Sequence, residues 1–393
     1  MSKEDDIIPF DTDEKDTKNK VKSLNKEVKL FKILSFALLA LMIIFAFIHF
    51  KGLSCSSFTM KETDILVLKE SDVSPIVQMS DIIDADETAL SLYSNKKADI
   101  PLRSNLNIPE YNGQCLFMNG YAGPSKALGV KIVSVYPNNI DKNLTSVPAT
   151  MVLVNAETGI VNALIDGTYI TRMRTGAVSG LATKLLARKD SKIFGLIGTG
   201  GQAITQLEAV LTVRNIEKVY VYDLNYERAK QFAENMTKKF GKKFNVEITA
   251  VKTSDEAVEN ADIITTVTVS KKPVFDGKKV KKNVHINAVG SYTPEMCEIP
   301  HEILVNANKI YVDTEHAIKE SGDIIQPIQK NLIKKEKITG ELGELINGKI
   351  KGRESDDEMT YFETTGSAVL DLVAAQKIYE IAKQNKIGRI IDM

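Results

Sequence analysis

The sequence predicts an α/β fold in which a doubly wound parallel sheet is joined to a discontinuous α+β domain and preceded by one transmembrane helix. Three observations predict it. From residue 191 onward, short apolar runs alternate with helical stretches, as in parallel βαβ units. Between residues 63 and 170, short β-type runs are separated by turn clusters and alternate in the antiparallel manner. Residues 30–50 are almost entirely apolar.

A glycine-rich turn at the start of the alternating region is the most informative motif. Gly198 permits a tight turn after the apolar run, Gly200 lets the backbone approach a pyrophosphate, and Ala203 keeps the next helix close to the sheet. We expect this helix to begin near Gly201 and to present its free N–H groups to phosphates. Asp223 ends the second run, where a carboxylate accepts hydrogen bonds from ribose hydroxyls. The pattern predicts a Rossmann-type dinucleotide site.

The identity of the residue at the end of the second run bears on the cofactor. The carboxylate of Asp223 favours ribose hydroxyls and repels a 2′-phosphate, so NAD(H) is the favoured cofactor. Arg228 follows closely and can turn to a phosphate, which keeps NADP(H) open as the alternative. The remaining residues of the turn, Thr199, Gly201 and Gln202, are assigned to the same site.

The predicted strands and helices divide the chain into domains. Helices are predicted over 171–189 and 368–384, and a hairpin turn over 155–159. Parallel strands are predicted at 194–197, 219–222, 246–251, 263–267, 285–289 and 309–312. The domains are a charged tail (1–29), a transmembrane anchor (30–50), a linker (51–62), a substrate-binding and dimerisation domain (63–190 and 314–393) and an NAD(P)-binding domain (191–313).

The N-terminal apolar stretch predicts a single-pass membrane anchor. Its unbroken core, 33–48, falls short of the roughly 20 residues that span a bilayer, but Lys32 and Lys51 can extend it by snorkelling. The basic flank before it favours a cytosolic N-terminus. That orientation puts the catalytic domain outside the cytosol, where nicotinamide cofactors are scarce. The sequence therefore leaves open on which side of the membrane the catalytic domain lies.

Composition excludes several kinds of partner. Lys and Arg balance Asp and Glu at 51 each, which gives no electrostatic reason to expect nucleic acid. The chain has three widely spaced cysteines and no CxxC pair, so we expect no metal site.

Three cations stand in unusual surroundings. Arg174 begins an apolar helix, Lys131 interrupts a strand, and Arg103 follows a Pro-Leu pair. Taken singly, each is a surface cation whose aliphatic stem covers apolar surface. Taken together, they are the groups that an amino-acid or imino-acid substrate needs, because a guanidinium grips a carboxylate through two parallel hydrogen bonds.

Several motifs together resemble the ornithine cyclodeaminase/mu-crystallin family over about residues 64–385. They are Pro101-Leu-Arg103, Val130-Lys-Ile-Val133, Thr171-Arg-Met-Arg-Thr-Gly-Ala-Val-Ser179, the glycine turn, His285-Ile-Asn-Ala-Val-Gly290, Glu320-Ser-Gly-Asp323 and Phe362-Glu-Thr-Thr-Gly366. The resemblance implies an NAD(P)-dependent homodimer that acts at the C–N bond of an amino acid or cyclic imine.

The resemblance also implies roles for particular residues. Arg103 and Arg174 match residues that hold the substrate carboxylate, and Lys131 matches one that polarises or protonates the substrate. Met118 is expected to give the substrate pocket a partly apolar wall. The implied cofactor-binding residues are Thr175, Thr268, Val289, Gly290 and Gly366.

One departure from the family decides between activities. Cyclodeaminases carry an aspartate as general acid/base two residues after the glycine of the Asn-Ala-Val-Gly turn, and Tyr292 stands there in this chain. A phenol with an ordinary pKa near 10 is no carboxylate base at neutral pH. We therefore predict a ketimine reductase or amino-acid dehydrogenase, with Tyr292 as a proton donor or a pocket wall and Glu298 or Asp323 as substitute carboxylates. Ornithine cyclodeaminase and a non-catalytic NAD(P)-dependent binding protein are the alternatives.

Overall fold

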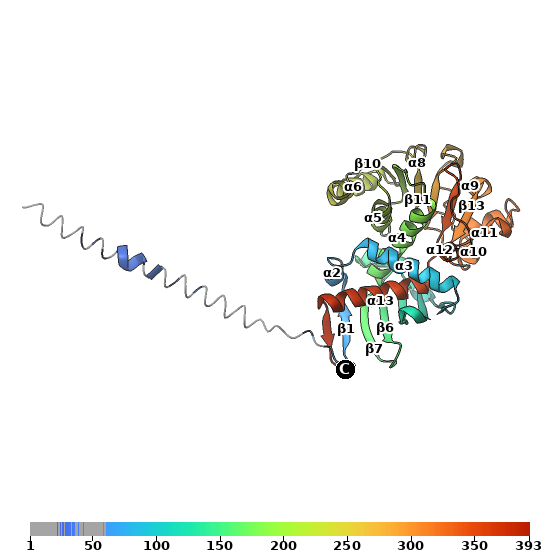
Figure 1. Ribbon diagram of the computed structural model, residues 1–393. Coiled ribbons are helices and arrows are strands. Elements are labelled where there is room, and N and C mark those ends of the chain that lie inside the picture. Colours follow the sequence, from blue (N-terminus) through green and yellow to red (C-terminus); the bar gives the residue numbers. More distant parts are fainter. Residues whose placement is uncertain are drawn as a thin grey trace, which may run out of the picture. The chain divides into compact units, whose positions relative to one another are not determined.

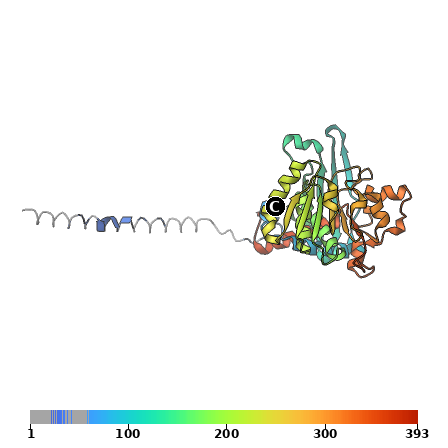
Figure 2. The same ribbon diagram turned by 90° about the horizontal axis from the view of Figure 1, so that it is seen from above.

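The computed structural model describes residues 22, 24, 26, 28–32, 34–35, 38, 42, 58 and 60–393. The chain divides into two units, residues 1–59 and residues 60–393. Both sheets and the candidate site belong to the second unit, which Figure 1 and Figure 2 show from two directions.

An eight-stranded parallel sheet forms one half of this unit. Its strand order is β10-β9-β8-β11-β12-β15-β13-β14, and all neighbouring strands run parallel. The order 3-2-1-4-5 of its first five strands is that of the doubly wound nucleotide fold, so the predicted Rossmann-type sheet is confirmed. The strands are β8 (Ile193–Ile197), β9 (Lys218–Tyr222), β10 (Glu247–Ala250), β11 (Ile263–Thr266), β12 (His285–Ala288), β13 (Lys309–Val312), β14 (Gly340–Glu341) and β15 (Thr360–Glu363).

The second sheet is mixed, with the order β16-β1-β7-β6-β5-β4-β2 and with β3 paired to β4. Its pairs are antiparallel except for β1 with β7, which run parallel. The predicted hairpin between β6 and β7 is confirmed. The strands are β1 (Ile65–Leu68), β2 (Ala98–Asp99), β3 (Ser104–Ile108), β4 (Gly113–Ala122), β5 (Ala127–Val135), β6 (Ala149–Asn155), β7 (Val161–Asp166) and β16 (Arg389–Ile391).

Two long helices bring the sheets together. Helix α4 (Gly167–Leu186) begins at Asp166, whose Oδ1 accepts a hydrogen bond from the Tyr169 N–H at 3.0 Å, and it is buried over most of its length. Thr183 on α4 accepts a hydrogen bond from the side-chain amide of Asn287 on β12 at 3.0 Å. Helix α13 (Ala368–Asn385) packs against β4 and β5 and also contacts α4.

Figure 1 shows α13 crossing the strands of the mixed sheet, with α3 and α4 between that sheet and the parallel sheet. The remaining helices are α2 (Glu70–Val73), α3 (Met79–Ser94), α5 (Ala203–Val213), α6 (Tyr226–Met236), α7 (Lys242–Phe244), α8 (Ser254–Val258), α9 (His301–Asn306), α10 (Ala317–Glu320), α11 (Gly322–Gln329) and α12 (Leu342–Ile346).

Strand β15 enters the parallel sheet from the C-terminal part of the chain. It lies between β12 and β13, although it falls within the predicted second segment of the substrate domain. Gly366, three residues beyond this strand, leads directly into α13. This connection places the end of the parallel sheet next to the mixed sheet. The domain boundaries themselves stay a prediction.

The structure corrects the predicted fold class, which included a transmembrane helix. Across the described residues, no helix combines the length and the apolar character that a bilayer crossing requires. The unbroken apolar core at 33–48 was already shorter than the roughly 20 residues of a spanning helix. Most of the predicted tail, anchor and linker (1–29, 30–50 and 51–62) lies outside the described residues. The predicted membrane partner is not supported.

Candidate active site

The glycine turn lies at the C-terminal end of β8, where ligands bind in doubly wound sheets. Gly198 has φ +102°, and a Cβ there would lie 2.8 Å from the Val267 carbonyl oxygen, so the position requires glycine. A Cβ at Gly200 or Gly201 would meet nothing within 4 Å, which leaves the backbone open to a ligand. The turn therefore fits a dinucleotide pyrophosphate. Helix α5 begins at Ala203, slightly later than predicted.

Asp223 lies beside this turn, just after β9. Its Oδ2 accepts hydrogen bonds from the Thr199 N–H at 3.0 Å and the Thr199 hydroxyl at 2.6 Å, and its Oδ1 accepts from the Asn225 N–H at 3.0 Å. Partial burial acts to raise the pKa of Asp223, but these hydrogen bonds outweigh it and lower the pKa. The group is an anchored carboxylate next to the phosphate turn, as a ribose contact requires.

A buried ionic cluster joins two of the predicted substrate residues. Lys131 on β5 and Arg174 on α4 both donate to Asp371 on α13, with Nζ to Oδ2 at 2.6 Å and Nε to Oδ1 at 2.9 Å. All three side chains are at most 7% exposed. Asp371 was missed in the sequence. The available signal was an aspartate within the apolar run that begins α13, between Leu370 and Leu372.

Burial and neighbouring charge set the protonation of this cluster. Burial lowers the pKa of Lys131 to about 8, against the opposing effect of the Asp371 carboxylate. Burial acts to raise the pKa of Asp371, but the positive charges of Arg174 and Lys131 outweigh it and lower that pKa. At neutral pH the cluster holds one anion between two cations, and Lys131 releases its proton more readily than a surface lysine.

The far side of the Arg174 guanidinium is not occupied by protein acceptors. Only Nε donates to a side chain, and no acceptor among the described residues contacts Nη1 or Nη2. Gly366, at φ +78°, lies against these nitrogens, and a Cβ there would clash with Nη1. The Gly366 N–H donates to Asp313 at 2.9 Å, which fixes the turn. Arg174 thus keeps two donors for the two oxygens of a substrate carboxylate.

Two further buried side chains belong to this region. Met118 on β4 pairs directly with Lys131 on β5, and it is 6% exposed. Asp86 on α3 is fully buried, and neither of its oxygens has a hydrogen-bond partner among the described residues. Burial raises the pKa of Asp86 well above its usual range, and the charge of Asp371 acts in the same direction. A neutral carboxyl group is therefore held beside the ionic cluster.

Two predicted residues lie apart from the cluster. Arg103 is paired with Glu320 on α10 and is about a quarter exposed. Its charge still acts to lower the pKa of Lys131, although less than burial and Arg174 do. Tyr292 is 46% exposed and forms no side-chain hydrogen bond with the described residues.

The predicted wall of the nicotinamide site is formed by the loops after β11 and β12. Thr268 lies in the first loop, and Val289 and Gly290 lie in the second. One oxygen of Glu298 accepts from the Thr268 N–H and the other accepts from the Gly290 N–H, each at 2.6 Å. Thr175 on α4 is buried, and its carbonyl oxygen accepts a hydrogen bond from the Gln206 side chain at 2.9 Å.

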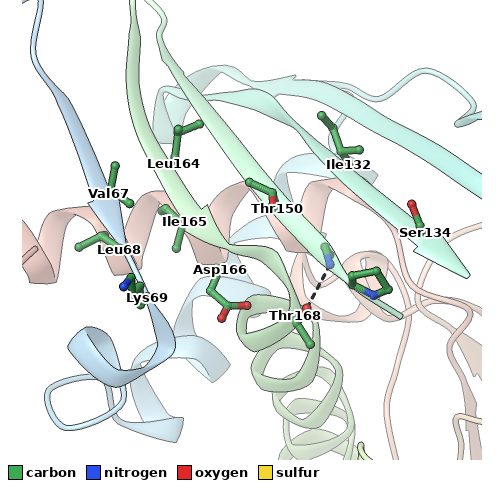
Figure 3. A pocket seen from close by; sticks show the side chains of 12 residues that line it. Val67, Leu68, Lys69, Ile132, Ser134, Thr150, Leu164, Ile165, Asp166 and Thr168 are labelled. Carbon is green, nitrogen blue, oxygen red and sulfur yellow. Dashed lines mark hydrogen bonds between the residues drawn. The ribbon is translucent and has the colours of Figure 1, made fainter. Parts of the chain in front are cut away.

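A cavity of about 570 Å³ lies on the other face of the mixed sheet (Figure 3). Ile132 and Ser134 on β5 line it, whereas Lys131, which directly precedes Ile132 on this strand, points to the opposite face. Thr168 lies at its edge and accepts a hydrogen bond from the Ala149 N–H at 3.1 Å. This cavity is separate from the cluster of Lys131, Asp371 and Arg174.

A dinucleotide turn and a buried cluster of two cations and a carboxylate within one unit of the chain are the features of a nucleotide-dependent oxidoreductase for a small carboxylate substrate. Sequence comparison makes the assignment specific, because residues 63–386 match the ornithine cyclodeaminase/mu-crystallin family. The chain belongs to this family, as its motifs predicted.

Relatives of this chain include reductases and dehydrogenases. A Delta(1)-pyrroline-2-carboxylate reductase of Bacillus cereus is 40% identical over 329 residues, which cover 84% of this chain and 100% of the relative. The Thermococcus litoralis Delta(1)-pyrroline-2-carboxylate reductase, solved with NADH and L-proline, is 43% identical with a TM-score of 0.78, covering 83% of this chain and 100% of that one. An archaeal alanine dehydrogenase dimer with bound NAD is 36% identical with a TM-score of 0.77, covering 84% and 99%.

These matches confirm the predicted class of enzyme, an NAD(P)H-dependent oxidoreductase that acts on the C–N bond of a cyclic imine or α-amino acid. They also confirm NAD(H) as the cofactor.

Proposed function

We propose that this chain reduces Delta(1)-pyrroline-2-carboxylate, or a related ring imine with a carboxylate on the imine carbon, using NADH. The observation that carries the proposal is the cluster in which Asp371 holds both Lys131 and Arg174, while the outer nitrogens of Arg174 have no hydrogen-bond acceptor among the described residues. This cluster supports the proposal because a guanidinium that can bind a carboxylate and an ammonium that can give a proton share one buried counter-ion.

The residues of the cluster divide the chemistry between them. The two free nitrogens of Arg174 bind the substrate carboxylate and fix the orientation of the imine. Lys131 gives its proton to the imine nitrogen, and its lowered pKa makes it a better acid than an ordinary lysine. Bound NADH would supply the hydride for the imine carbon. One proton and one hydride convert the C=N bond to the C–N bond of the amino acid.

Neighbouring residues complete the site. Asp371 keeps Lys131 charged until the proton is transferred, because a carboxylate at 2.6 Å favours the ammonium form. Met118, directly opposite Lys131, supplies apolar surface for the ring methylene groups of the substrate. Arg103 supplies a second cation for the carboxylate when it leaves Glu320. Tyr292 is assigned no proton transfer, since its side chain is exposed and unpaired in this structure.

We also propose that the chain acts as a homodimer. The face of the mixed sheet around the cavity presents Ile132, which is 36% exposed, together with half-buried Val67 and Leu164. An apolar sheet face of this kind is typical of a subunit interface. The archaeal alanine dehydrogenase relative is itself a dimer. Light scattering should give twice the chain mass of 43.5 kDa.

The experiment follows oxidation of NADH and of NADPH by the full-length chain with Delta(1)-pyrroline-2-carboxylate and its six-membered homologue. The proposal expects turnover that is lost in Arg174→Ala. Arg172→Ala is the matched control, because Arg172 is on the same helix but pairs with Glu70 at the surface. Ammonia release from ornithine without net NADH consumption would instead support a cyclodeaminase. Cofactor binding without either reaction would support a binding protein.

A further inference from the structure

One buried carboxylate joins the two loops that follow β11 and β12. Glu298 accepts three hydrogen bonds, from the Thr268 N–H at 2.6 Å, the Gly290 N–H at 2.6 Å and the Thr266 hydroxyl at 3.2 Å. Its side chain is completely buried. The carboxylate therefore bridges the two loops, in addition to the main-chain hydrogen bond that the Val289 N–H donates to the Thr266 carbonyl oxygen at 3.1 Å.

The position of these loops gives the contact its functional meaning. Both follow parallel strands at their carboxyl ends, where doubly wound sheets bind their ligands. The packing between them is tight, because a Cβ at Gly290 would clash with the Thr268 carbonyl oxygen and with Glu298 Oε2. A change in the carboxylate would therefore move the main chain of Thr268 and Gly290.

A second buried acid holds the segment that carries this carboxylate. Oδ1 of Asp323, at the start of α11, accepts hydrogen bonds from the N–H groups of Glu298 at 2.8 Å and Ile299 at 2.9 Å. The Asp323 N–H is in turn within hydrogen-bond distance of the Ser291 hydroxyl, in the loop after β12. The support of the two loops thus extends from Asp323 through Glu298 to the main chain at Thr268 and Gly290.

We propose that Glu298 is a positioning residue that sets the two loops against the nicotinamide end of the cofactor. The inference rests on the proposed function, since it assigns the loops to the NADH site. It replaces the earlier expectation that Glu298 acts as a substitute acid or base, because both of its oxygens already serve main-chain donors. Its contribution is to orient NADH, and it leaves the binding of the imine to Arg174.

The test is Glu298→Gln in the full-length chain. Glutamine has the same shape, but its amide nitrogen must face one of the two main-chain N–H groups, so one of the two main-chain hydrogen bonds is lost. Loss of one of the two main-chain hydrogen bonds to this buried side chain predicts roughly tenfold weaker binding of NADH. NADH fluorescence measures binding without turnover, and steady-state kinetics should show a raised KM for NADH, a lowered kcat and an unchanged KM for the imine.

Two further variants make the result decisive. Glu295→Gln is the control, because Glu295 is an exposed carboxylate in the same segment and should leave NADH binding unchanged. Thr266→Val removes only the weakest of the three hydrogen bonds and is expected to shift NADH binding in the same direction by a few fold, even if Glu298→Gln folds poorly.

The outcomes separate the inference from the proposed function. Unchanged NADH binding in folded Glu298→Gln and Thr266→Val overturns the positioning role. A wild-type chain that binds NADH without reducing the imines overturns the proposed substrate, while the binding measurements still test Glu298. A wild-type chain that binds no NADH overturns both.

Discussion

Replacing Asp371 with asparagine tests how the two buried cations are held. Asparagine keeps the shape of the side chain but replaces one acceptor oxygen with an N–H₂ donor. That donor must face either Lys131 Nζ or Arg174 Nε, which lie 2.6 and 2.9 Å from the present carboxylate oxygens. The variant therefore loses a charge and places two donors against each other.

The expected loss of stability is large because the cluster is buried. Removing one member of a buried ion pair costs about 3–5 kcal/mol, since the remaining charge is left without a counter-ion. The surface pair Lys126 and Glu157 is a matched control, with an ammonium and a carboxylate again 2.6 Å apart but with both side chains 68% exposed. Glu157→Gln should leave the free energy of unfolding nearly unchanged, because exposed ion pairs contribute little to stability.

The same substitution should also remove most of the activity. Without the carboxylate, burial and the nearby charge of Arg174 both lower the pKa of Lys131 further, so that the proton donor is lost at neutral pH. A positioned general acid contributes about 10²–10⁴ to the rate, so kcat should fall by at least about 100-fold.

Denaturant unfolding and NADH oxidation provide the two readouts for Asp371→Asn and Glu157→Gln. The reasoning is refuted if the two variants lose similar stability, or if Asp371→Asn retains the wild-type rate.

Three further predictions follow from the charges of the site. The reduction rate should fall as pH rises through the Lys131 pKa of about 8, because the donor must be protonated, and a flat pH profile across that value would contradict its role. Asp86→Asn should raise thermal stability above neutral pH. Burial raises the folded-state pKa of Asp86. The carboxyl group therefore favours folding in acid and loses that contribution as pH rises through this pKa. The melting temperature of Asp86→Asn should therefore exceed that of the wild type by an amount that shrinks as the pH falls to about 4, the ordinary aspartate pKa. An equal difference in melting temperature at every pH would count against the argument. Asp223→Ser should increase the NADPH-to-NADH ratio of kcat/KM by at least about tenfold, because the carboxylate and the 2′-phosphate of NADPH are close like charges, which cost several kcal/mol. An unchanged ratio would exclude Asp223 from the ribose site.

The parts of the fold that were predicted correctly depend on local sequence. The parallel strands are short apolar runs, and their alternation with helices is visible without any knowledge of distant contacts. The glycine turn is equally local, since Gly198 needs its positive φ and Gly200 its open backbone within a single loop. Arg174 and Lys131 were recognised because each is a cation in an apolar element.

The parts that were missed depend on contacts between distant segments. Asp371 is 240 residues from Lys131 and 197 from Arg174, so neither sequence spacing nor periodicity joins them. Glu298 was recognised as a carboxylate, but its place between two loops depends on the register of β11 with β12. The predicted transmembrane helix has no counterpart among the described residues, which leave out most of 30–50, and its unbroken apolar segment is shorter than the roughly 20 residues of a spanning helix.

The most direct test of the central claim is the transfer of deuterium from NADH, labelled on the transferring position, to the product of Delta(1)-pyrroline-2-carboxylate reduction. The account predicts proline with one deuterium on its α-carbon and the loss of one NADH for each proline formed. Proline without deuterium, or proline formed from ornithine with no net loss of NADH, would contradict it.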